Sequence, residues 1–197
     1  MIALLIGYLV GGLPTADWIA GWFGIDLRAA GSGNPGANNA RRLGGARLGV
    51  AVLIVEAAKG VSAVVLGGTV AGVQGMVWAG LGAVAGNVIN PYRRFRGGQG
   101  LGITAGVLGG AWPGMLPSAI AIIAVTALVT RSSPKAALAA VAALLVGGFV
   151  WPAAGFPTPW GATGGWISVL GVGTALLLSP KQLINLRRIG GGQTAPR

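Results

Sequence analysis

The chain of 197 residues contains no cysteine, no histidine and only three acidic residues, and charged residues make up 9% of it. The absence of cysteine excludes disulfides and thiolate metal sites, and it removes any redox clue to the compartment. The absence of histidine removes the commonest general base near neutral pH. Soluble domains carry about 25% charged residues. The composition therefore favours a membrane protein.

Hydrophobic residues make up 53% of the chain and gather into seven runs in which Asp17, Glu56 and Lys59 are the only charged residues. These runs are 2–25, 48–72, 73–89, 101–115, 116–130, 136–151 and 166–179. A bilayer-spanning helix needs about 20 apolar residues, a length that the runs approach. The first run lacks the basic start of a cleavable signal peptide, so we interpret it as the first span.

Glycine is the second informative residue type, with 38 copies in the chain. In an apolar sequence, small residues four apart indicate helices that pack closely inside the membrane. The candidate pairs are Gly68 with Gly72, Gly82 with Gly86, and Gly102 with Gly106. We expect these positions to face neighbouring helices.

Basic connections between the runs alternate with uncharged ones. The basic connections and the C-terminal end carry Arg28, Arg41, Arg42 and Arg47; then Arg93, Arg94 and Arg96; then Arg131 and Lys135; then Lys181, Arg187, Arg188 and Arg197. The connections around 72–74, 113–117 and 152–165 carry no charge. Because basic loops stay on the cytoplasmic side, this pattern places the N-terminus outside and the C-terminus in the cytoplasm.

Tryptophans support the same orientation, because five of them fall near the opposite membrane face, where an aromatic belt is expected. They are Trp78, Trp112, Trp151, Trp160 and Trp166. The sequence thus predicts an all-α integral membrane protein of about seven transmembrane helices. Residues 1–189 would form a single polytopic domain, and 190–197 a frayed tail. In 101–130 the alternative is a re-entrant pair broken at Pro113 and Pro117.

Three polar, glycine-rich stretches fall on the predicted cytoplasmic face. The first, 31–42, has the sequence GSGNPGANNARR. Its glycines, Gly31, Gly33 and Gly36, permit positive φ, at which successive N–H groups can form an anion-binding nest. Side-chain donors and arginines suited to phosphate follow: Ser32, Asn34, Asn38, Asn39, Arg41 and Arg42. The alternative is a flexible loop whose arginines only set topology.

The second stretch, 90–102, reads NPYRRFRGGQGLG, and its glycines lead into an apolar helix. A glycine loop that opens a helix presents free N–H groups to an anion. It lacks the Gly-Lys-Ser/Thr of a Walker sequence, and a basic patch for lipid headgroups is an equal alternative. The third stretch, NLRRIGGG at 185–192, is by itself interpretable as a basic end cap.

The charged residues inside the spans are a separate group. Glu56 and Lys59 lie three residues apart and therefore on one helix face. Charges in a membrane usually face a partner or a polar cavity. A mutual structural pair and a functional role both remain open for them, and Asp17 is positioned to reach a basic loop.

With these residues in view, the chain resembles the bacterial acyl-phosphate:glycerol-3-phosphate acyltransferases (the PlsY type), nearly from end to end. YLVGGLP at 8–14 is similar to the family's Tyr-Leu-x-Gly-Ser-Ile-Pro, and GIDLRAAGSGNPGANNARRLG at 24–44 to its Gly-x-Asp-x-Arg-x-x-Gly-Ser-Gly-Asn signature. Glu56 and Lys59 stand where the family has Asp-x-x-Lys-Gly. GNVINPYRRFRGGQG and QLINLRRIGGG resemble its last two motifs.

The resemblance implies a multi-pass enzyme of the bacterial inner membrane with its active site on the cytoplasmic face. Such an enzyme moves a fatty acyl group from acyl phosphate to the 1-hydroxyl of glycerol 3-phosphate, and makes lysophosphatidic acid for phospholipid synthesis. It uses no metal and no cofactor, and its partners are these two substrates and membrane lipids, without nucleic acid. The oligomeric state is left open.

The resemblance also implies residue roles. It assigns catalytic positions to Ser32, Asn34, Arg42 and Asn185. It assigns phosphate binding to Gly31, Gly33, Asn39, Lys59, Arg96, Gly97, Gly98, Gly100 and Arg188. Lys59 would orient the first loop, and the residues from Arg96 to Gly100 would form a phosphate cradle.

Several positions depart from the family pattern. Gln99 replaces a Lys, Asn87 and Gln182 replace two His, Asn38 replaces a Thr and Gly12 a Ser, and Gln193 and Thr194 stand where a Glu is expected. A catalytically weakened or silent paralogue that binds lipid or a partner protein is therefore the alternative function. A transporter is disfavoured, because the polar residues gather at one face instead of the midplane.

Overall fold

The computed structural model describes residues 1–190, and this part of the chain is helical without strands. Two short 3-10 turns, Pro91–Arg93 and Pro159–Gly161, interrupt the connections. The helices are α1 (Ile2–Gly12), α2 (Thr15–Trp22), α3 (Ala37–Val88), α4 (Leu101–Ala111), α5 (Met115–Thr130), α6 (Ser133–Ala153) and α7 (Gly164–Gly190). Of the predicted tail, residues 191–197 lie outside the described part.

Four stretches are long and apolar enough to cross a membrane: Ile2–Trp22, Ala37–Arg93, Ser133–Ala153 and Gly164–Arg187. Two shorter apolar helices, α4 and α5, complete the set. Large apolar side chains such as Leu128 and Val129 are 78% exposed, a surface that suits lipid tails and not water. The expectation of an all-helical membrane protein is confirmed.

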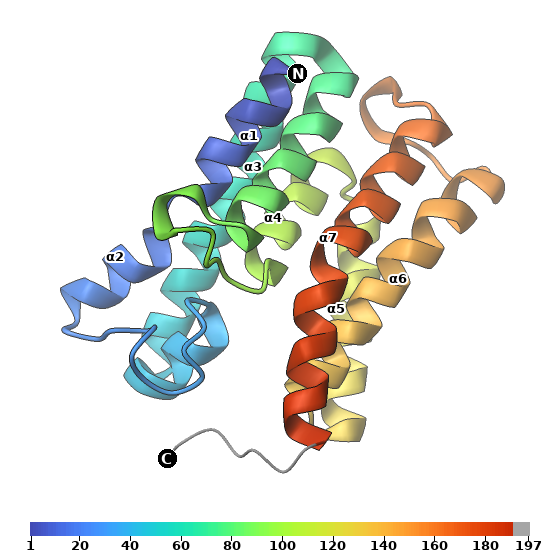
Figure 1. The fold of residues 1–197 in the computed structure, drawn as a ribbon. Helices are drawn as coiled ribbons and strands as arrows, with labels where there is room; N and C mark the ends of the chain where they lie inside the picture. Colours follow the sequence, from blue (N-terminus) through green and yellow to red (C-terminus); the bar gives the residue numbers. More distant parts are fainter. Residues whose placement is uncertain (191–197) are drawn as a thin grey trace.

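Helix α3 is bent at two places, and the bends account for its length of 52 residues. Gly45 has φ 80°, and Ala71 and Gly72 leave helical geometry with φ −149° and 55°. The second bend reverses the chain, as Figure 1 shows beside the N-terminus. It lies at the predicted boundary between runs 48–72 and 73–89. Each of the seven predicted runs therefore contains a helical segment.

The helices pack closely at glycines. A Cβ added to Gly82 or Gly86 would fall on the backbone of α1, at Leu4 and Tyr8 respectively. A Cβ on Gly106 would fall on the carbonyl of Ala57, where α4 crosses α3. Helices α5, α6 and α7 pack beside this group as a second set (Figure 1). Two of the three predicted small-residue pairs thus mark close helix contacts.

The connections lie at two ends of the bundle. Figure 1 shows the bend at 71–72 and the α6–α7 connection at the end that holds the N-terminus, and the α5–α6 turn at the other end. The first two are uncharged, and Arg131 begins the third. For these three connections, the two uncharged ones lie at one end of the bundle and the basic one lies at the other, as the predicted alternation requires.

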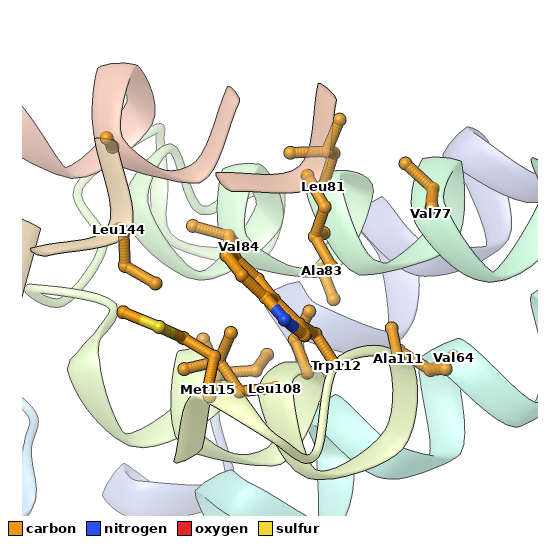
Figure 2. Close-up of a cluster of buried hydrophobic side chains, with 14 of the residues drawn as sticks. Val64, Val77, Leu81, Ala83, Val84, Leu108, Ala111, Trp112, Met115 and Leu144 are labelled. Carbon is orange, nitrogen blue, oxygen red and sulfur yellow. The ribbon is translucent and has the colours of Figure 1, made fainter. Parts of the chain in front are cut away.

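One predicted belt residue belongs instead to the core. Trp112 is fully buried and packs edge-on against Trp151, with ring centroids 5.6 Å apart. Figure 2 shows it among Val84, Leu108 and Met115. The prediction that Trp112 anchors the surface is wrong, because the half-buried Trp151 and the surrounding helices cover its ring.

Candidate functional site

The site begins at the break between α1 and α2, at Leu13 and Pro14. The last carbonyls of a helix have no partner in the helix, and proline cannot donate an N–H. Side chains from α3 and the following turn supply the donors. The Lys59 ammonium donates to the Leu13 and Gly11 oxygens at 2.8 and 3.3 Å, and the Asn90 amide donates to the Gly12 oxygen at 2.7 Å.

Glu56 joins the same network from one turn away on α3. Its carboxylate forms an ion pair with Lys59 at 2.8 Å. It also accepts the Thr15 hydroxyl at 2.8 Å and the Asn87 amide at 2.6 Å. Glu56 and Lys59 are each only 7% exposed. Of the two open interpretations, the mutual structural pair describes this geometry.

That Lys59 orients the first loop stays a prediction, and its direct contacts are of another kind. Its ammonium contacts the α1–α2 break and Glu56, not the glycine-rich stretch at 31–36. Because α1 lies against α3, Lys59 of α3 reaches the carbonyls that precede α2 and so holds the start of α2.

The connection 23–36, called the first loop below, is held by Asn39. Asn39 is buried, and its amide donates to the oxygens of Leu27 and Ala30 at 2.8 and 3.1 Å. Its own oxygen accepts the Ser32 N–H at 2.9 Å. Because these bonds occupy both ends of the amide, Asn39 organises the loop and is not open to a phosphate in this conformation.

Two of the three glycines that permit positive φ in this loop adopt it: Gly31 at 63° and Gly33 at 68°. The third, Gly36, is extended with φ −145°, because it is the N-cap residue of α3. The freedom to adopt positive φ is thus used at Gly31 and Gly33 and not at Gly36. Nearby, the backbone N–H groups of Arg28 and Ala29 hold the pKa of the Asp26 carboxyl below its ordinary value.

The predicted catalytic side chains of this region face outward. Ser32 and Arg42 are exposed, and Asn34 is half-buried. The Ser32 hydroxyl accepts only the Asn34 N–H, at 3.5 Å. Within residues 1–187, whose side chains the structure describes, the Arg42 guanidinium contacts no carboxylate. Both groups are therefore available to a ligand.

Arg28 and Arg93 were not among the predicted site residues, yet they tie the loops together. The Asp17 carboxylate pairs with Arg28 at 3.0 Å and lies 3.3 Å from Arg93. Arg28 also donates to the backbone oxygen of Arg96 at 2.8 Å. The expectation that Asp17 reaches a basic loop is confirmed, and it was the one sequence signal for this cluster.

The connection 89–100, called the second loop, is held from two sides. The Gly98 N–H donates to the Asn87 oxygen at 2.9 Å. From α7, Lys181 donates to the oxygens of Gly97 and Gly98 at 2.5 and 2.8 Å. Gln182 donates to the Gln99 oxygen at 3.2 Å. Two of the replaced family positions, Asn87 and Gln182, thus contact this loop or its support.

The glycines of the second loop serve different needs. Gly100 has φ 81° and is the N-cap residue of α4. Gly97 is required by close approach, because a Cβ there would fall on the oxygens of Asn87 and Val88. Positive φ also occurs at Arg94 and Phe95, at 49° and 62°. This loop is therefore shaped by its contacts as well as by its glycines.

A small polar pocket lies where these elements meet. It is lined by Leu13, Pro14, Ala16, Asp17, Arg28, Pro35, Glu56, Lys59, Asn87, Asn90 and Gly98. A larger open groove of about 390 Å³ adjoins it at Asp17 and Arg28 and runs along α2 and the first loop. Both loops and the start of α2 therefore share one polar region.

Helix α7 contacts the second loop just before the third predicted stretch, 185–192. Lys181 and Gln182 contact the second loop, whereas Asn185, a predicted catalytic residue, is half-buried and has no side-chain hydrogen bond within the described part of the chain. The side chain of Arg188 lies outside the described residues.

Comparison with known proteins gives the same family throughout. A family profile described as Glycerol-3-phosphate acyltransferase matches residues 1–191. A glycerol-3-phosphate acyltransferase of Synechococcus sp. (strain JA-3-3Ab) is 42% identical over 165 residues, which cover 81% of this chain and 78% of that protein. The Rhodopseudomonas palustris (strain HaA2) glycerol-3-phosphate acyltransferase is 38% identical over 151 residues, with 76% and 75% covered.

The fold also has a counterpart among solved structures. The crystal structure of PlsY (YgiH), an integral membrane glycerol 3-phosphate acyltransferase in its glycerol 3-phosphate form, superposes with a TM-score of 0.81. The match covers 100% of this chain and 94% of that one at 24% identity. Its lysophosphatidic acid form matches with the same TM-score at 23% identity.

Proposed function

The chain belongs to the glycerol-3-phosphate acyltransferase family, and on this premise we propose that it uses acyl phosphate to acylate glycerol 3-phosphate where the two loops meet. The main support for this site is that the first loop, the second loop and α7, which are far apart in the sequence, contact one another. Arg28 of the first loop donates to the Arg96 oxygen, and Lys181 of α7 donates to the oxygens of Gly97 and Gly98. The product is lysophosphatidic acid.

The reaction joins the 1-hydroxyl oxygen of glycerol 3-phosphate to the acyl carbonyl carbon. The bond from that carbon to the phosphate oxygen breaks, and inorganic phosphate leaves. The chain has no histidine, and its three carboxylates all accept hydrogen bonds from other groups. A phosphate oxygen of the donor therefore takes the hydroxyl proton, and the protein supplies positioning and charge.

Within this proposal the substrates are bound by side chains at the start of α3 and in the first loop, and by the backbone of the second loop. Arg42 and the N–H groups of Gly97 and Gly100 bind phosphate oxygens, and Ser32 with Asn34 positions the attacking hydroxyl. Asn185 and Arg188 close the site from α7. Asn39 and Lys59 act indirectly: the hydrogen bonds of Asn39 hold the first loop, and those of Lys59 hold the α1–α2 break.

The same proposal covers topology. Seven spans would place the N-terminus outside and the loop region in the cytoplasm of a bacterium, at its inner membrane. The exposed basic residues support this orientation, since Arg42 lies in the first turns of α3 and Arg96 on the second loop, both beside the site.

The test is a transfer assay on detergent-purified protein with palmitoyl phosphate and labelled glycerol 3-phosphate. We expect lysophosphatidic acid from the native chain, and none from Ser32→Ala or Arg42→Ala, with membrane insertion unchanged. Arg47→Ala, which removes an exposed arginine of the same helix, is the matched control and should stay active. Turnover in both site variants would show that the proposed site is wrong.

A second arm restores the family residues together, as Gln99→Lys with Asn87→His and Gln182→His. Product from the native chain would establish transfer without those groups. Product from the restored chain alone would mean that this chain has kept the fold and lost the catalysis.

A further inference from the structure

Lys181 has no acidic partner in the described part of the chain. The chain has only three carboxylate side chains, and each is committed elsewhere. Asp17 pairs with two arginines, Glu56 pairs with Lys59 at 2.8 Å, and Asp26 accepts two backbone N–H groups. A half-buried ammonium without a counter-charge is costly, and an anionic ligand beside it would offset that cost.

The position of this ammonium is fixed by the second loop. Lys181 donates to the oxygens of Gly97 and Gly98, which occupy two of its three N–H groups. The third has no acceptor within the described residues. The neighbouring residue Gln182 is fully buried and donates to the Gln99 oxygen, so α7 contacts three successive residues of the loop.

These contacts leave the loop with bound oxygens and free N–H groups. Arg28 holds the Arg96 oxygen, α7 holds the next three, and the Thr104 N–H holds that of Gly100. Among the turn, loop and cap hydrogen bonds of the described residues, none is donated by the N–H of Gly97 or of Gly100. Carbonyl oxygens repel a phosphate and N–H groups attract it, so this arrangement favours an anion at the start of α4.

We propose that Lys181 is a positioning residue of the acyltransferase and the cation that serves the second loop. It turns the oxygens of Gly97 and Gly98 away from the phosphate, and it places a positive charge beside the position of Gln99. This inference rests on the proposed function and extends it to a residue on α7. The charge thus comes from a helix at the far end of the sequence instead of from the loop.

The experiment compares kcat and KM of purified variants in the transfer assay. Lys181→Met removes the ammonium and keeps the apolar stem, and we expect kcat/KM to fall about 10–100-fold, chiefly through KM for a phosphorylated substrate. Lys135→Met, which removes an exposed lysine at the start of α6, is the matched control and should keep wild-type values. Lys181→Arg should retain most activity.

The decisive variant moves the charge. Adding Gln99→Lys to Lys181→Met should recover at least part of the lost kcat/KM, because the cation then comes from the loop itself. A purely structural role for Lys181 predicts no such recovery. The proposal is overturned if Lys181→Met behaves as Lys135→Met, or if neither Lys181→Arg nor the added Gln99→Lys restores the loss.

A binding measurement separates this inference from the proposed function. Inorganic phosphate should raise the apparent unfolding midpoint of the wild-type protein in detergent, and should raise that of Lys181→Met much less. If the native chain makes no lysophosphatidic acid, the proposed function fails and this measurement alone decides the role of Lys181. An equal phosphate effect in both proteins would then overturn it.

Discussion

Replacing Lys59 by methionine removes one half of a buried ion pair and both hydrogen bonds that Lys59 donates at the end of α1. In the structure, Lys59 lies 2.8 Å from the Glu56 carboxylate and donates to the Leu13 and Gly11 oxygens. Breaking a buried pair by removing one partner costs about 3–5 kcal/mol. For a chain of this size that corresponds to a fall of roughly 6–20 °C in the unfolding midpoint.

The assay is thermal unfolding of detergent-purified protein at a fixed scan rate, with the exposed Lys135→Met as the control. A double-mutant cycle with Glu56→Gln isolates the pair. Because Lys59→Met leaves Glu56 charged and buried, removing that charge as well should recover about 1 kcal/mol or more. A midpoint for Lys59→Met within about 2–4 °C of the control, or additive losses in the cycle, would refute the reasoning.

Three further predictions concern the loops and the helix contacts. Asn39→Ala should lower transfer by at least about tenfold and speed hydrogen exchange in the first loop, since three hydrogen bonds are lost; the exposed neighbour Asn38→Ala should do neither. Gly106→Ala should abolish stable expression, because the added Cβ falls on the backbone of α3, whereas Gly109→Ala, whose Cβ has only an ordinary 3.7 Å contact, should express normally. Asp26→Asn should lower the unfolding midpoint near neutral pH. Because the folded pKa lies below the ordinary 3.8, that stabilisation is fully present well above 3.8 and is lost as pH falls through the lowered pKa, so variant and wild type should converge there.

The fold was predictable from local patterns. Each apolar run contains a helical segment because a bilayer leaves the backbone few alternatives. The glycine pairs 82/86 and 102/106 mark close contacts, because only glycine lets two backbones approach so nearly. Positive φ at Gly31 and Gly33 followed from the same freedom of glycine.

The contacts of the site were less predictable, because they join residues far apart in the chain. Lys59 reaches Leu13, 46 residues away, and Lys181 reaches Gly97, 84 residues away. Spacing in the sequence shows that Glu56 and Lys59 share a helix face, but it does not show which segment will lie against that face. Asn39 carries an amide of the kind that binds ligands, but in the structure this amide donates to the Leu27 oxygen of the first loop.

The pairing of α1 with the second half of α3 constrains the order in which the protein can assemble. Gly82 and Gly86 touch Leu4 and Tyr8, and residues 13–72 separate the partners along the chain. The glycine-lined surface against which the first helix packs is therefore missing until the third apolar run has entered the bilayer. The carbonyls of Gly11 and Leu13, in contrast, are bound by Lys59, which belongs to the second apolar run. The last carbonyls of the N-terminal helix thus find their donor on one apolar run and its packing surface on the next, so capping can precede docking.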